Sequence, residues 1–320
     1  MSIAEYSSVF KKWTFGSLKE TFREHFRPTK IENITGSCFD PVYAHYLHSN
    51  EDFLMNVPLA KVRSMGFLGF ACTSSGGHPF VDTLMEYEQG RCVTYEGSAL
   101  QRHYETVQPR TAAALLGLPP TGLSERLAAL TALQAVAPWW PDRGKISPEG
   151  IEQHQQKRTL EENRENGADL CAADGVSLWG PVSDRKGRLE YNRLITILKS
   201  IRINGYKRSD ARHGDISGTL FQSYENNYIV NISAGQHRVA ALAALGYEEI
   251  PVRFSRTFFA RTVRREDAAN WPFVRNGLFT ETQARLVFDR IMTGRTSRSE
   301  DGTTDLCMFR RRNEDIPLAG

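Results

Sequence analysis

Apolar side chains recur at helical spacing between residues 189 and 206, at Leu194, Ile197, Leu198 and Ile201. This period predicts an amphipathic helix that ends at Gly205, a residue type suited to a helix C-terminus. In residues 214–233 the apolar runs are short and flank a Glu-Asn-Asn turn, which predicts two strands joined as a hairpin.

The pattern then changes back to a helix and ends in one more strand. The apolar run 228–232 leads into Gly-Gln-His-Arg at 235–238, and an alanine- and leucine-rich segment follows. Residues 250–254 again read as a strand. Helix, hairpin, helix and strand together predict a compact α+β unit over residues 171–256.

Residues 1–170 are mixed in pattern, and we expect them to be mostly helical and to pack around that unit. The periodic segments predict an amphipathic helix at 15–26, a helix beginning near Pro79, two short helices within 95–120 and one helix over 124–136. The polar segment 151–175 has a weak apolar face, which indicates an exposed helix or linker and a boundary near residue 170.

Residues 257–320 predict one or two helices and a polar tail after Thr293. Thr280 precedes Gln283 by three residues, the spacing of a capping box that starts the last helix.

Composition places the chain among soluble globular proteins. It has 320 residues, 40% of them hydrophobic and 24% charged, with a formal net charge of +3. This charge is too mild to indicate nucleic-acid binding, and the arginine clusters at 261–265 and 310–312 are typical of solvated faces. Nucleic acid is therefore an unlikely partner.

The five cysteines are odd in number and form no Cys-x-x-Cys pair, which argues against a disulfide framework or a thiolate zinc site. No apolar run reaches the length of a membrane span, and the first residues lack the apolar core of a signal peptide. These features predict a cytoplasmic protein without a membrane span.

Residues 235–238 combine the parts of a phosphate-binding helix N-terminus. Gly235 permits a close approach to the backbone, and the first N–H groups of a helix carry partial positive charge. Arg238 adds a guanidinium, while Gln236 and His237 complete the cradle, His237 being able to donate a hydrogen bond or move a proton. In the alternative reading Gly235 only makes a turn, His237 is a satisfied structural residue and Arg238 pairs with an acid.

The segment "ISAGQHRVAALAALGYEEIPVRF" resembles the signature of the ParB/sulfiredoxin superfamily, in which a strand, a G-x-H-R or G-x-R-R turn, a helix and an "IPV" strand follow one another. The upstream helix "RLITILKSIRINGY" is also similar to that family. The resemblance covers about residues 181–255, and it implies a small mixed sheet with helices, extended here by an N-terminal region and C-terminal helices.

The branches of this superfamily imply different chemistries. Sulfiredoxins carry a catalytic cysteine where this chain has Gln236, and chromosome-partition ParB proteins carry G-E-R-R and a helix-turn-helix that residues 256–320 do not display. The motif "AGQHR" is more similar to the "DGxHR" of kinases that phosphorylate free serine.

The kinase resemblance implies phosphoryl transfer from ATP or ADP, with Mg²⁺, to a hydroxyl of a small acceptor. His237 would contact a phosphate or bridging oxygen, and Glu190 or Asp184 would accept the acceptor's proton. The metal ligands are left open, and Glu190 can also be read as an exposed acid favoured by a helix N-terminus.

Four further residues are candidate substrate ligands: His213, Asp215, His78 and Arg102. Each also has an ordinary structural reading, as part of a turn, a cap or a packed helix. The whole architecture, including residues 270–279, resembles uncharacterised proteins encoded beside bacterial surface-polysaccharide genes, which favours a sugar-like acceptor over a hydroxy-amino-acid one.

Three alternatives stay open beside the kinase. One is a non-catalytic regulator that binds a nucleotide in the same cradle. Another is a ParB-like nuclease, which needs metal-binding carboxylates and a basic groove. The third is a purely structural partner protein whose cradle holds no ligand. The preferred nucleotide, the acceptor and the oligomeric state are not determined by the sequence.

Overall fold

The computed structural model describes residues 31–37, 39–49, 51–73, 77–141, 147–208, 214–224, 227–255 and 261–294. The helix expected at 15–26, the tail expected after Thr293 except Gly294, and His213 lie outside these residues.

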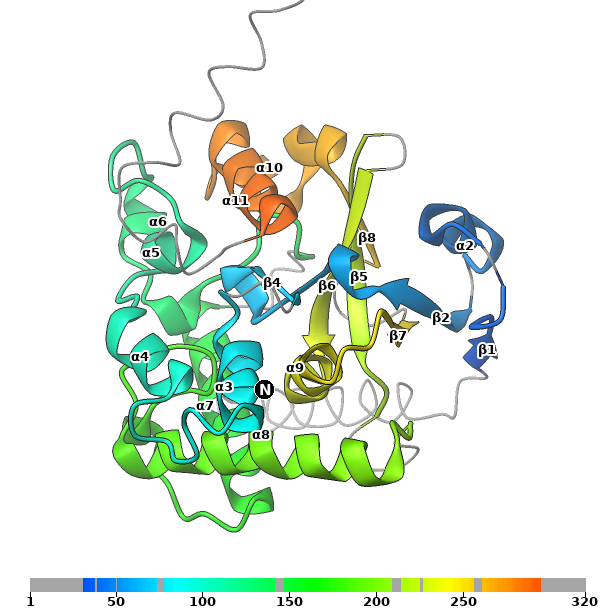
Figure 1. Cartoon of the computed structure of the whole chain (residues 1–320). Helices are drawn as coiled ribbons and strands as arrows, with labels where there is room; N and C mark the ends of the chain where they lie inside the picture. Colours follow the sequence, from blue (N-terminus) through cyan, green and yellow to red (C-terminus); the bar gives the residue numbers. More distant parts are fainter. Residues whose placement is uncertain are drawn as a thin grey trace, which may run out of the picture.

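Eight strands within the described residues form one mixed sheet, in the order β1-β2-β7-β5-β6-β3-β4, with β8 paired to β5 (Figure 1). The strands are β1 (Ile31–Asn33), β2 (Asp52–Pro58), β3 (Val62–Ser64), β4 (Phe70–Ala71), β5 (Ser217–Tyr224), β6 (Asn227–Ala234), β7 (Glu249–Phe254) and β8 (Thr262–Arg264). The chain is therefore a mixed α/β protein, consistent with the α+β class.

Strands from both ends of the chain alternate in this sheet. Strand β2 is antiparallel to β7, with Phe53 opposite Phe254, and β3 is parallel to β6, with Val62 opposite Val230. Strands β5 and β6 form the expected antiparallel hairpin. The sheet thus includes strands from both sides of the boundary near residue 170, and the four early strands lie in the region expected to be mostly helical.

Ten α-helices lie in the described residues. They are α2 (Pro41–Leu47), α3 (Pro79–Glu88), α4 (Ala99–Thr106), α5 (Ala112–Leu116), α6 (Glu125–Ala128), α7 (Pro148–Glu165), α8 (Asp184–Asn204), α9 (Gln236–Ala244), α10 (Pro272–Arg275) and α11 (Glu281–Thr293). The expected helix starts at Pro79 and Thr280 are confirmed, the latter with both bonds of the Thr280–Gln283 capping box.

The single helix predicted over 124–136 is wrong. The helix α6 ends at Ala128, and a 3-10 turn follows at Ala132–Gln134. Between them the backbone leaves the helix to pair with an earlier segment, because Ala112 N donates to Leu130 O and Ala132 N donates to Arg110 O. These two hydrogen bonds replace the helical ones that the apolar spacing alone would favour.

The polar segment, expected to be an exposed helix or a linker, forms the 18-residue helix α7, which Ser147 caps at its N-terminus. Its buried residues are Ile151, Thr159 and Asn163, so a single narrow stripe of the helix faces the protein. Two of these three residues are polar, which explains why the apolar period was weak.

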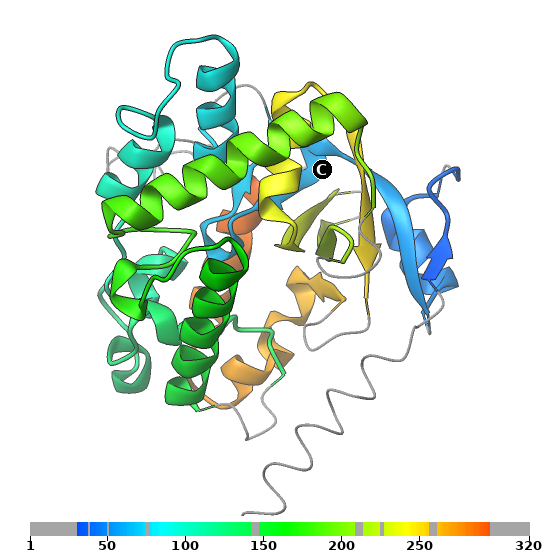
Figure 2. The same cartoon turned by 90° about the horizontal axis from the view of Figure 1, so that it is seen from below.

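Helix α9 packs against both α3 and α8, and these three helices form a layer beside the sheet. Figure 2 shows the same region from below, with the long helix α8 running past α9. Elsewhere the core contains an aromatic cluster in which Phe221 stacks on Phe288 and meets Trp139 edge to face. Burial of each of the two phenylalanine side chains contributes roughly 1.5–3 kcal/mol.

Within the described residues, none of the helices combines the length and the apolar character that crossing a membrane demands.

Candidate phosphate-binding helix and histidine site

Gly235 joins β6 to α9 in a left-handed backbone conformation, with φ of 89°. A Cβ at this position would lie 3.0 Å from Ile216 Cγ1 and 3.1 Å from Arg238 Nη2. Both the positive φ and the close neighbours favour glycine, because an L side chain would be strained in φ and crowded by these two atoms. The turn from strand to helix therefore depends on this residue.

The N-terminus of α9 differs from most others in the described part of the chain. Helices α2 to α8 and α11 each begin with a side chain that accepts from a first-turn N–H group, whereas α9 and the four-residue α10 do not. The first-turn N–H groups of α9 thus lack the usual internal acceptor, which leaves partial positive charge at this end.

Gln236 is used to fasten the helix. Its Oε1 accepts from Met65 N at 2.8 Å, and its Nε2 donates to Ile232 O at 2.8 Å. The side chain therefore connects α9 to the preceding strand and to the turn after β3. Of the expected cradle, Gln236 can contribute its backbone N–H but not its side chain.

Arg238 folds back toward the start of its own helix. Its Nη1 donates to Gly214 O at 2.8 Å, and its Nη2 lies close to Gly235. The half-buried guanidinium thus lies beside the helix N-terminus and adds a full positive charge there. The positive charge of the guanidinium and the partial positive charge of the helix N-terminus lie close together, and both attract an anion placed between them.

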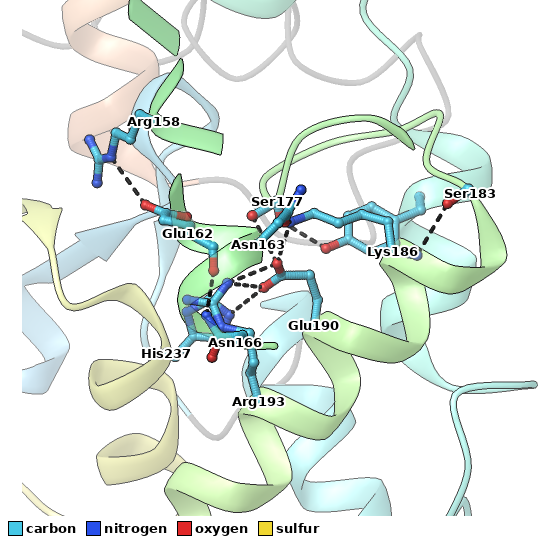
Figure 3. A network of polar contacts seen from close by, with 11 residues as sticks. Arg158, Glu162, Asn163, Asn166, Ser177, Ser183, Lys186, Glu190, Arg193 and His237 are labelled. Carbon is cyan, nitrogen blue, oxygen red and sulfur yellow. Dashed lines mark hydrogen bonds and ion pairs between the residues drawn. The ribbon is translucent and has the colours of Figure 1, made fainter. Parts of the chain in front are cut away.

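His237 points the other way, into a buried polar network (Figure 3). Its Nε2 lies 2.9 Å from Glu190 Oε2, and its ring stacks on Phe80 with centroids 5.0 Å apart. The side chain is 12% exposed. Helix α8 therefore supplies the partner of the ring nitrogen, and α3 supplies the surface that fixes the ring plane.

Glu190 is the centre of that network and is completely buried. Besides His237, its carboxylate accepts from Lys186 Nζ at 2.6 Å, Arg193 Nη1 at 2.8 and 2.9 Å, and Ser177 Oγ at 3.0 Å. Burial by itself raises the pKa of Glu190. The hydrogen bond from His237, the charge that this ring carries at the low pH where Glu190 titrates, and the charges of Arg193 and Lys186 outweigh it. The pKa therefore lies well below its ordinary value.

The alternative reading of Glu190 as an exposed helix-start acid does not hold, since the residue is buried. Its carboxylate is ionised and its oxygens are occupied by donors, so it suits the role of an anchor for His237 more than that of a proton acceptor.

The protonation of His237 follows from its surroundings. Burial lowers its pKa, and although the hydrogen bond to Glu190 raises it, the net pKa is below the ordinary value of 6.5. At neutral pH the ring is uncharged, and because the carboxylate can only accept, Nε2 carries the proton. The lone pair is then on Nδ1, which bonds to no described residue.

Helix α7 closes the network from the other side. Lys186 Nζ donates to Asn163 Oδ1 at 2.6 Å, and both side chains are fully buried. Asn163 Nδ2 is also buried and finds no acceptor among the described residues. At the preceding position of α7, Glu162 pairs with Arg158, and its negative charge acts on His237.

The remaining sequence candidates lie outside this network. Asp184 is exposed in the first turn of α8, where an acid is favoured by the helix dipole. Asp215 is buried and forms a bidentate ion pair with Arg208, whose Nε and Nη2 lie 2.7 and 2.9 Å from the two carboxylate oxygens. The backbone oxygen of the neighbouring Gly214 accepts a hydrogen bond from Arg238. Asp215 is thus near the cradle, but its carboxylate is already engaged.

His78 and Arg102 have structural partners. His78 is fully buried, caps α3 through Nδ1 and bonds Ser64 Oγ through Nε2 at 2.6 Å. Arg102 is exposed and pairs with Glu86. Neither side chain is placed to contact a ligand at the start of α9.

Sequence reasoning missed several members of the network: Lys186, Arg193, Ser177, Asn163 and Phe80. One signal was available, since Lys186 and Arg193 stand four residues before and three residues after Glu190, on one face of α8. Charged residues at such spacing usually lie on a solvent-exposed face of a helix. Here that face of α8 is covered by α7 and α9, and the local sequence does not reveal this packing.

A Mg²⁺ ion, which the family resemblance implies, lacks suitable carboxylates here. Glu190 is saturated with donors, Asp215 is held by Arg208, and Asp184 is outside the network. Among the described residues no group of three or more His, Cys, Asp or Glu side chains is arranged to hold a metal ion.

Comparisons with protein-family models, with curated proteins and with solved structures found no match to this chain.

Proposed function

We propose that this protein is a nucleotide-dependent phosphotransferase with a ParB/sulfiredoxin-like core, moving a phosphoryl group from ATP or ADP to a hydroxyl of a small sugar-like or hydroxy-amino-acid acceptor. One observation carries the proposal. A neutral histidine oriented by a buried carboxylate and an arginine folded over the helix start occupy consecutive positions of one uncapped first turn.

The nucleotide phosphates fit the start of α9. The N–H groups of the first turn and the Arg238 guanidinium present positive charge to an anion, and Gly235 keeps the approach free of a Cβ. Phosphoryl transfer depends mainly on positioning and charge neutralisation, which this arrangement supplies without covalent participation of the protein.

His237 takes the role of general base. Its Nδ1 accepts the proton of the acceptor hydroxyl while the hydroxyl oxygen forms a bond to the terminal phosphorus. The bond from that phosphorus to the bridging oxygen breaks, and the nucleotide leaves as ADP from ATP or as AMP from ADP. The proton on His237 then passes to solvent, and Glu190 stabilises the imidazolium that exists in between.

Glu190 therefore acts through His237 as a positioning residue. Because its carboxylate does not suit Mg²⁺, and neither Asp184 nor Asp215 is open to the cradle, no step is assigned to a protein-bound metal. A divalent ion brought in by the nucleotide would be held by phosphate oxygens and water.

Isothermal titration of the full chain with ATP, ADP and CTP tests the nucleotide site. Wild-type protein should bind at least one of them, and Arg238→Ala should weaken that binding about tenfold or more, because a charge-assisted contact to phosphate is lost. Arg275→Ala, which removes an exposed arginine on α10, is the matched control and should bind normally. Absence of binding to wild-type protein for all three nucleotides would overturn the proposal.

A nucleotide-binding regulator is the second candidate. It is favoured by the saturation of Glu190, which makes the network resemble a structural anchor. The two candidates differ in turnover. Release of ADP or AMP that depends on an added hydroxyl compound identifies the enzyme, whereas tight binding without any product identifies the regulator. The nuclease reading lacks support, since it needs open carboxylates near the motif.

A further inference from the structure

Arg193 uses only part of its hydrogen-bonding capacity. Its Nη1 contacts both oxygens of Glu190, and the side chain is 17% exposed. Within the described residues, Nε and Nη2 have no hydrogen-bond partner, and neither is among the fully buried unsatisfied atoms. One edge of the guanidinium therefore faces accessible space.

The guanidinium itself lies beside His237. Arg193 Nη1 and His237 Nε2 both bond Glu190 Oε2, so the two side chains are neighbours on one carboxylate oxygen. The charge of Arg193 lowers the pKa of His237, as expected for a close cation. Figure 3 shows both residues reaching Glu190 from the same side of α8.

The charges around Glu190 do not balance. Lys186 and Arg193 are positive, Glu190 alone is negative between them, and His237 is neutral. On α7 the facing charges, Arg158 and Glu162, neutralise each other. One positive charge in a largely buried cluster is thus left without a counter-ion, an arrangement that is costly unless an anion binds there.

We propose that Arg193 binds an anionic group of the acceptor, so that the acceptor is an acid rather than a neutral sugar. This inference rests on the proposed function. A carboxylate or phosphate on the acceptor matches the edge of a guanidinium with two oxygens. Arg238 holds the nucleotide on one side of His237, and Arg193 orients the acceptor on the other.

The test follows the ring resonances of His237 by NMR in the full chain labelled with ¹³C-histidine and without nucleotide, with His237→Gln providing the assignment. Three probes share one skeleton: glycerol, glycerate and glycerol phosphate. We expect glycerate, glycerol phosphate or both to shift the His237 signal in a saturable way, and glycerol to leave it unchanged.

The variant Arg193→Gln should weaken the binding of the responding acid about tenfold or more. Arg193→Lys keeps the positive charge but loses the paired N–H donors of the guanidinium, and it should weaken the binding less. Arg188→Gln is the matched control, because Arg188 is on the same helix but is exposed and paired with Glu96. It should leave the affinity unchanged. Raising the salt concentration should weaken the binding to wild-type protein, which a purely structural role of Arg193 does not predict.

The probes also separate the two sources of negative charge. A response to glycerate that depends on Arg193 identifies a carboxylate, and a response to glycerol phosphate alone that depends on Arg193 identifies a phosphate; either supports the inference. It is overturned if glycerol binds as well as the acids, if no probe shifts His237, or if the acid binds Arg193→Gln with unchanged affinity. It is also overturned if only Arg238→Ala abolishes the response, because the probe then sits in the nucleotide cradle.

Because no nucleotide is used, this result is independent of the titration with ATP, ADP and CTP. If the acid binds at Arg193 but the protein binds no nucleotide, the proposed function is contradicted and the anion site at Arg193 is still supported.

Discussion

His78 and His237 both contact the ring of Phe80 from the N-terminal ends of two different helices, and they differ in how their ring nitrogens are hydrogen-bonded. His78 lies 5.9 Å from the Phe80 ring centroid and is the N-cap of α3, whereas His237 lies 5.0 Å from it in the first turn of α9. Both nitrogens of His78 are bonded within the protein. His237 bonds through one nitrogen, and among the described residues the other has no partner.

This difference separates a structural histidine from a chemical one. Burial lowers the pKa of His78 to about 3, and with no nitrogen to spare the ring serves only to cap α3 and to hold Ser64. His237 is oriented as firmly, by Glu190 and Phe80, yet keeps a lone pair for a ligand. Neighbouring residues hold both histidine rings in place. Only His237 has a ring nitrogen without a partner among the described residues, and this makes it the candidate base.

The largest expected effect is on turnover. His237→Gln should reduce product formation about 100- to 10,000-fold, the usual contribution of a general base, because a glutamine amide can still bond Glu190 but cannot accept the proton. Its free energy of unfolding should change by no more than about 1 kcal/mol. Initial-rate measurements and urea unfolding check the two parts. Unchanged turnover would remove the distinction between the two histidines.

The converse substitution should affect stability. His78→Ala removes the cap of α3, leaves Ser64 without its partner and opens a cavity, for a loss of about 3 kcal/mol in the free energy of unfolding. His78→Asn retains a capping oxygen and should lose less. Urea unfolding of the two variants measures the difference, and a loss as large in His78→Asn as in His78→Ala would show that capping is not what His78 contributes.

A separate test of the burial of His78 is the pH dependence of stability. In the folded protein the pKa of His78 is about 3, below the value of 6.5 expected for the unfolded chain, so the unfolded state binds the extra proton first as the pH falls. Relative to His78→Asn, wild-type protein should therefore lose about 1.4 kcal/mol of stability per pH unit from about pH 6.5 down to pH 3, and nothing above pH 6.5. Unfolding curves of both proteins between pH 4 and pH 8 measure this slope. Parallel curves would mean that His78 is not held neutral by burial.

Turnover should follow a different group over the same range. His237 must be neutral to accept a proton, and its pKa is below 6.5. Activity should therefore stay constant from neutral pH to below pH 6.5 and fall only as His237 becomes protonated.

Local patterns predicted the elements that carry the site. The helix ending at Gly205, the hairpin, the helix after Gly235 and the last strand are all present, because each is determined by neighbouring residues. Strands β1 to β4 were not predicted, since their partners are distant in sequence and a short apolar run does not reveal its pairing. The segment 124–136 was mistaken for one helix for the same reason.

The candidate site was predicted in part. The turn 235–238 has a recognisable local signature, so its position and its glycine were foreseeable. The buried state of Glu190 and the roles of Lys186 and Arg193 depend on the packing of α7 and α9 onto α8, which is a tertiary property. His78 was singled out for its chemistry, but its burial makes it a helix cap.

The pairing of β2 with β7 also constrains how the chain is made. Asp52 and Arg253, which form an ion pair across these strands, are 201 residues apart. A ribosome that adds about 5–20 residues per second takes roughly ten to forty seconds to bridge that interval. During this time the apolar strand β2 has left the ribosome without β7, one of its two neighbours in the sheet. The pairing of β2 with β7 can therefore form only after β7 has emerged, and until then β2 has one unpaired edge.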